Sequence, residues 1–325
     1  MSCEERIRYI NTVKTASTHP VYKPLYDNLT GLHKTVFYGY GIHQKDFFLP
    51  WHRWYILQYE NLLRKIDCRV TVPYWDWSLV AGDPWSSSIW NTGDDGFGGN
   101  GVPWQRCVNT GPFKATVWSL PASAGEGCLR RNFTGFVPDA ITVKNVITIL
   151  SNFNQFEYIL RNAFHNGVHC SIGGTMCSND SATAPEFFLH HGFVDKIWWD
   201  WQKSHTCKGY DFFHDQTGKM PFTPYRSRDF LDLKDQPDCV CVEYVDPKND
   251  VYGRIKVMSQ KIIPKTPRSK LPPVSDDAKS LFNVSEAEMG TLSQFEAKIQ
   301  PKLVQERSSL RGKEAMLGFN SSYLY

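Results

Sequence analysis

The stretch FLPWHRWYILQYE, residues 48–60, places a histidine and an arginine on one amphipathic segment. Apolar residues such as Trp54 and Leu57 recur among polar ones with the period of a half-buried helix, which we predict over residues 51–66. The helix would start just after Pro50, because proline is well tolerated where a helix begins. This segment therefore favours a mainly α fold.

Further helices are predicted on both sides of that segment. Periodic apolar positions indicate them at residues 4–15, 21–38, 143–150, 154–169 and 185–203. Residues 81–134 are instead rich in Gly, Ser, Asn and Pro, which is typical of a long irregular excursion. We predict a disulfide between Cys107 and Cys128 that cross-links this segment.

The bulk composition excludes several partners. The chain has 325 residues, 41% of them hydrophobic, and a net charge of +3 without a long run of Lys or Arg. Neither nucleic acid nor an anionic membrane is indicated as a partner by this charge pattern. No run of 18 apolar residues exists that would cross a membrane as a helix.

The cysteines and sequons predict an extracellular protein. Nine cysteines form no C-x-x-C pair of the kind that binds zinc, so disulfides are expected. Five Asn-x-Ser/Thr sequons agree with secretion and glycosylation; they begin at Asn28, Asn132, Asn179, Asn283 and Asn320. Residues 1–14 lack the apolar core of a signal peptide, so we expect that a leader has been removed.

Six of the ten histidines form two groups in the sequence: His33, His43 and His52, then His165, His169 and His191. Two of the second group are four residues apart, so on a helix both rings project from one face and can reach one metal. Sites made only of imidazole nitrogen suit copper, zinc, iron or nickel.

Two other interpretations of these histidines remain open at this point. Each one alone is as easily a core or surface histidine bonded to a neighbour. A mononuclear zinc hydrolase would need the pattern His-Glu-x-x-His, whereas Asn166, Gly167 and Val168 lie between His165 and His169. That alternative also leaves the first group without a role.

Four motifs, in this order, resemble the copper A and copper B signatures of the tyrosinase family, in particular secreted animal tyrosinases. They are residues 48–53 with Tyr55 and Glu60, residues 73–77 (PYWDW), residues 165–169 (HNGVH) and residues 187–195 (FFLHHGFVD). The resemblance implies a mainly α fold with a four-helix-bundle core that holds two copper ions, with long irregular loops and few short strands.

The resemblance also implies the ligands. His33, His43 and His52 would bind copper A, with His19 a conceivable substitute for His33. His165, His169 and His191 would bind copper B. The neighbouring His190 would be structural, because adjacent helical positions diverge by about 100°.

Two further residues gain a catalytic role from the resemblance. Asn166, with a carboxylate that holds a water, would assist deprotonation of monophenols, and Glu157 is the matching carboxylate. A solvated Glu157 on a helix face is an equal alternative. Asp195 would pair with Arg53, or form an ordinary ion pair elsewhere. Ala184 replaces the usual Asp of the copper B motif, so a helix cap is either lost or passed to Thr183.

The predicted function is a tyrosinase that uses O2 to hydroxylate monophenols and oxidise o-diphenols to o-quinones. A catechol oxidase limited to diphenols, a haemocyanin-like oxygen carrier and a matrix protein with a decayed site are the alternatives. The substrate would be a small phenol or a protein tyrosine. Residues 1–245 would form the catalytic domain, and residues 246–325 an extension with a linker at 263–273 and a surface helix at 285–308.

Overall fold

The computed structural model describes residues 1–44, 47–205, 217–245 and 271–316, with side chains as far as Ser309. Within these ranges the fold is mainly helical, as predicted, and the few short strands expected are reduced to isolated β-bridges. The helices are α1 (Cys3–Thr18), α2 (Lys23–Val36), α3 (Phe48–Arg64), α4 (Ala140–Ile149), α5 (Phe153–Ile159), α6 (Gly167–Ile172), α7 (Phe187–Ser204), α9 (Asp276–Leu281) and α10 (Glu286–Met316). None of the helices in these ranges is long and apolar enough to cross a membrane.

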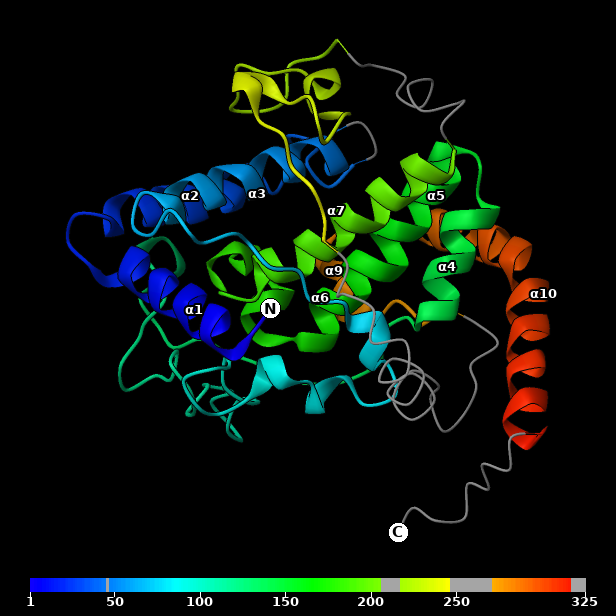
Figure 1. The fold of residues 1–325 in the computed structure, drawn as a ribbon, viewed down its shortest axis with the longest axis horizontal. Helices are drawn as coiled ribbons and strands as arrows, with labels where there is room; N and C mark the ends of the chain where they lie inside the picture. The colour runs from blue at the N-terminus through cyan, green and yellow to red at the C-terminus, as the bar shows by residue number, and fades with distance from the viewer. Residues whose placement is uncertain (45–46, 206–216, 246–270, 317–325) are drawn as a thin grey trace.

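The core of the fold lies where α2 and α3 meet α7 and the segment that leads into α6. Helices α2 and α3 run side by side, α3 packs on α7, and α7 packs on residues 160–166 (Figure 1). Large rings fill this core; Tyr59 of α3 and Phe188 of α7, for example, stack with their ring centroids 3.5 Å apart. The aromatic packing holds the inner faces of these helices in fixed positions.

Helix α3 begins three residues earlier than predicted. It starts at Phe48, and Pro50 therefore lies within its first turn. A proline there costs little, because the first N–H groups of a helix have no partner within it. The prediction was wrong because it placed the proline at the helix start.

The helix predicted over residues 154–169 is interrupted by a π-helical segment. It consists of α5, a π-helix over Leu160–Asn166, and α6. A π turn holds more residues than an α turn, and such turns occur often at functional sites. The pattern of apolar residues did not reveal it, because one irregular turn barely disturbs the helical period.

The irregular excursion is cross-linked within itself by a disulfide and tied to the helical core by a buried ion pair. The predicted disulfide between Cys107 and Cys128 is confirmed. Arg131 is fully buried, forms an ion pair with Glu186 at 2.7 Å and donates hydrogen bonds to the carbonyls of Phe97 and Gly98. Because Glu186 directly precedes α7, the excursion is held against the start of that helix.

The cap that Ala184 lacks has not passed to Thr183. Helix α7 begins after Glu186 without a side-chain cap, and the Thr183 hydroxyl donates to the carbonyl of Asp180 instead. Residues 181–183 form a separate 3-10 turn, which turns Thr183 away from the helix.

The C-terminal helix α10 lies along the side of α4 (Figure 1). Ile299 and Leu303 are fully buried, and Arg307 pairs with Asp139 at 2.7 Å. Residues 263–270 of the predicted linker lie outside the described residues. The division of the chain at residue 245 stays a prediction.

Candidate metal centre

The first three histidines converge, although they come from separate parts of the chain. His33 lies on α2 and is 1% exposed, and His52 lies on α3 and is 3% exposed. His43 lies in the turn between these helices. One ring nitrogen from each lies within 4.8 Å of the other two, and this set is called trio A. His19, the considered substitute, is exposed and outside both groups.

The second three histidines also converge. His165 is the second-last residue of the π segment, His169 lies on α6 and His191 on α7. The Nε2 atom of His191 lies 3.3 Å from Nε2 of His165 and 3.1 Å from Nε2 of His169. Nitrogens about 2 Å from a shared first-row metal would be separated by roughly this distance. We call this set trio B.

His190 competes with His191 for the third position of trio B. One nitrogen from each of His165, His169 and His190 also lies within 4.8 Å of the others. Both rings are buried, and neither ring nitrogen of His190 has a hydrogen-bond partner. The helical divergence of adjacent residues does not by itself exclude His190, since both rings contact His169.

The two trios face each other across a short gap. The rings of His52 and His191 are nearly parallel with their centroids 4.4 Å apart, and those of His43 and His165 are 5.8 Å apart. The six predicted ligands therefore surround one compact space.

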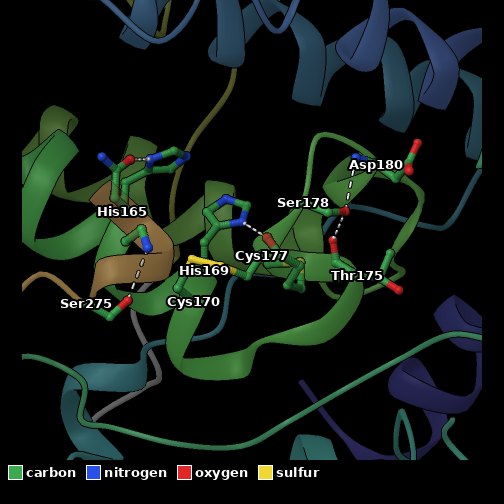
Figure 2. Close-up of a disulfide and its surroundings, with 11 residues drawn as sticks. His165, His169, Cys170, Thr175, Cys177, Ser178, Asp180 and Ser275 are labelled. Carbon is green, nitrogen blue, oxygen red and sulfur yellow. Dashed lines mark hydrogen bonds between the residues drawn. A yellow bond between two sulfur atoms is a disulfide. The ribbon is translucent and has the colours of Figure 1, made fainter. Parts of the chain in front are cut away.

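Hydrogen bonds at Nδ1 orient several of the rings. Nδ1 of His52 lies 2.7 Å from the carbonyl oxygen of Phe48. Nδ1 of His169 lies 2.7 Å from the carbonyl oxygen of Met176, and Figure 2 shows the ring of His169 beside the disulfide. Metal-binding histidines commonly use the second nitrogen in this way, which fixes the tautomer and leaves Nε2 for the metal. The 3-10 turn Gly174–Cys177 that supplies Met176 is joined to α6 by the disulfide Cys170–Cys177.

The remaining nitrogens fit a metal better than a closed core. Nε2 of His52 and both nitrogens of His33 are buried without a hydrogen-bond partner. Burial is the main cause that lowers the pKa of His52 to about 3 and that of His169 to about 4. The rings are thus kept neutral, which is the form that binds metal. A site made of neutral imidazoles suits copper.

The two predicted catalytic residues lie on the segment that leads to trio B. The Asn166 side-chain oxygen is 2.7 Å from Nδ1 of His165, and its amide nitrogen donates to Asn162. Glu157 is 1% exposed and accepts a hydrogen bond of 2.6 Å from Arg161. The structure thus gives Asn166 a direct contact with a predicted ligand and gives Glu157 a buried cation as its partner.

The predicted pair between Arg53 and Asp195 is confirmed at 2.8 Å. Arg53 follows His52, and Asp195 lies one helical turn after His191. Tyr244 donates a further hydrogen bond to Asp195. This buried pair ties α3 to α7, and thereby fixes the two metal-bearing helices relative to each other.

One residue beside the centre was missed from the sequence. Phe282 follows α9, and its ring centroid lies 5.4 Å from both His43 and His165 and 5.9 Å from His169. It contacts both trios although it lies far from them in the chain. A single aromatic residue in a Lys- and Pro-rich tail carries no signal that would have revealed this.

Comparisons with known proteins agree with the geometry. The model for the common central domain of tyrosinase matches residues 23–204. The tyrosinase of Streptomyces glaucescens is 35% identical over 186 residues, which cover 52% of this chain and 66% of that one. A tyrosinase of Aspergillus flavus is 32% identical over 197 residues, covering 55% and 54% of the two chains. This chain thus spans about half to two thirds of the length of these relatives.

A solved structure shares the fold. The polyphenol oxidase of Thermothelomyces thermophila superposes with a TM-score of 0.56 at 22% identity, covering 76% of this chain and 87% of that one. The matched region of the family model includes both histidine trios. The chain therefore belongs to the tyrosinase family, and its two buried groups of histidines form the type 3 binuclear copper site of that family.

Proposed function

We propose that this chain is a phenol oxidase that uses O2 to hydroxylate monophenols and to oxidise o-diphenols to o-quinones. The observation that carries the proposal is the convergence of two histidine trios on one buried space. We propose His33, His43, His52, His165, His169 and His191 as the ligands. Bound copper would supply the redox chemistry with dioxygen, and the protein would supply position and charge.

The side chains around trio B would handle the proton of the phenol. A phenol has a pKa near 10, so a base is needed near neutral pH. Glu157 would hold a water that accepts this proton, and Arg161 would keep the carboxylate in place. Asn166 would orient both that water and the ring of His165.

A catechol oxidase limited to diphenols is the second candidate. The hydrogen bonds of Asn166 go to His165 and Asn162, while Glu157 is engaged by Arg161. If no water joins these two groups, the monophenol would lose its base. A diphenol would still be oxidised, because that reaction does not depend on this pair.

Phe282 would control access to the copper site. Its ring contacts His43 and His165, where the ring of a phenol must approach both metals. This contact gives the proposed C-terminal extension, residues 246–325, a role beside the catalytic domain. An oxygen carrier would also benefit from a covered site, so turnover must decide between carrier and enzyme.

We further propose that the protein is secreted and of the animal type. The two disulfides support an oxidising compartment. Asn28 and Asn283, which start two sequons, are exposed and open to glycosylation. Either a small phenol or a tyrosine of another secreted protein remains a suitable substrate.

One set of assays tests these proposals. Protein loaded with two copper ions per chain is incubated with catechol and with tyramine, and quinone absorbance is followed. Colour from both substrates, with a lag for tyramine, supports the tyrosinase. Colour from catechol alone supports the second candidate. Reversible oxygen binding without colour contradicts both and supports a carrier.

A further inference from the structure

Two exposed cysteines lie at the ends of neighbouring helices. Cys3 is the first residue of α1, and Cys68 lies in the turn shortly after α3 ends at Arg64. Neither belongs to the two disulfides of the structure. Helices α1 and α3 pack against each other. Contacts between residues near the two cysteines therefore indicate how close these cysteines lie.

Two contacts relate α1 to α3 and to the turn that follows it. The buried phenols of Tyr9 on α1 and Tyr59 on α3 lie close enough to affect each other's pKa, although burial is the main cause that raises both. One step back along α1, Arg8 lies 3.8 Å from Asp67. Arg8, in the first half of α1, therefore reaches the turn that follows the end of α3.

Further charged contacts join the first turn of α1 to the turn after α3. Arg8 binds Glu4 at 3.1 Å as well as Asp67, so these two acids share one guanidinium. Arg69, which binds Asp67 at 2.7 Å, also feels the charge of Glu4. Cys3 directly precedes Glu4, and Cys68 lies between Asp67 and Arg69, so both cysteines are chain neighbours of this small charged cluster.

We propose that Cys3 and Cys68 form a third disulfide that ties the start of α1 to the end of α3. Each thiol gives up one proton and one electron as the S–S bond forms. A small-molecule or protein disulfide takes up the two protons and two electrons and is reduced to two thiols. Two disulfides lie within the described part of the chain, which agrees with maturation where such an oxidant is present.

The proposed bond would enclose the whole of trio A. The loop that it closes spans residues 4–67 and contains His33, His43 and His52. A cross-link over a loop of this length restricts the unfolded chain more than a short one does. Trio B already has a covalent tie nearby, since Cys170 directly follows His169. The new bond would give trio A a tie of its own.

The test uses the full chain produced in an oxidising secretory pathway. Alkylation without reduction, followed by proteolysis and mass spectrometry, should reveal a peptide with Cys3 joined to Cys68, which reduction separates. Cys239→Ser removes another exposed cysteine and should leave this linked peptide intact. Recovery of both cysteines in alkylated form, or of either one joined to a different partner, would overturn the proposal.

A second measurement distinguishes a bond from mere proximity. Cys3→Ser, Cys68→Ser and the double variant should each lower Tm by the same amount, on the order of 5 °C, because any one of them removes the same cross-link. Reduction of the wild type should reproduce this shift on top of the loss from the other disulfides. Additive shifts in the double variant would show two independent side chains instead.

Discussion

Trio A and trio B have the same composition, three histidines each, but are supported differently. In trio B, Nδ1 of His165 and of His169 each has a partner at 2.7 Å, and a disulfide joins α6 to the turn that supplies one of them. In trio A, only His52 has so short a bond; Nδ1 of His43 lies 3.4 Å from the carbonyl of Phe37.

Neither buried nitrogen of His33 in trio A has a partner, whereas in trio B only Nδ1 of His191 lacks one. His33 is held only by rings around it, such as that of Phe187 at 4.9 Å. Hydrogen bonds fix the orientation of a ligand before the metal arrives, whereas packing alone permits small rotations. We therefore expect copper B to bind more tightly than copper A.

The largest effect should come from the disputed third ligand of trio B. His191→Ala should lower copper content from two ions per chain to one and reduce catechol oxidation at least about 100-fold. Loss of a direct metal ligand should weaken copper binding more than loss of a ligand's hydrogen-bond partner. His190→Ala is the matched control and should keep both ions. Metal analysis and quinone assays check this. The reverse result would assign His190 as the ligand.

Asn166→Ala should reduce monophenol activity about 10-fold more than diphenol activity. The change removes the partner of His165 Nδ1 and the proposed support of the water. Asn162→Ala, which removes only the next group in the chain of contacts, is the control. The rates on tyramine and catechol give the ratio. Equal losses on both substrates would leave Asn166 as a support of the metal alone.

Loss of the disulfide near trio B should make the two trios more alike. In Cys170→Ser with Cys177→Ser, we expect copper B affinity to fall about 10-fold, because the turn that supplies the Met176 carbonyl is released. Loss of copper during titration with a chelator measures this. The pair Cys107→Ser with Cys128→Ser, which unties a loop without a ligand, should leave affinity unchanged. An equal loss there would argue against a local effect.

Phe282→Ala should lower KM for catechol a few-fold, because it removes a ring that contacts both trios. Phe295→Ala on α10 is the control, since its ring packs on Tyr158 and not on a histidine. Steady-state kinetics separate KM from kcat. A raised KM would show instead that Phe282 helps to bind the substrate.

The smallest effect concerns the copper-free protein. The pKa of His52 is about 3 and that of His169 about 4, both below the ordinary value because of burial. The unfolded chain therefore binds more protons below pH 6.5, and stability is lost as pH falls from there toward these values. We expect Tm of the copper-free protein to decline by a few degrees between pH 6.5 and 5. A flat Tm would show that the rings are more open to water.

The sequence predicted the chemical parts of the site better than their supports. The four motifs contain four of the six predicted ligands, His52, His165, His169 and His191, and the Arg53–Asp195 pair was predicted from its position beside them, because strong chemical constraints leave a local pattern. Phe282, the buried Arg131–Glu186 pair and the π segment depend on contacts between distant residues or on one irregular turn. Such features leave no period in the sequence, so they could not be predicted from it.

The π segment has a consequence for how the molecule tolerates change. Helix α5 faces α10, whereas residues 160–166 face α7. The wider turns of the π segment change the direction in which its side chains point relative to those of α5. The two segments are continuous, but they pack on different neighbours. If the same residues formed an ordinary α-helix instead, the direction of His165 relative to α5 would change by roughly a quarter of a turn. The position of His165 at the copper centre thus depends on the wider turns that precede it.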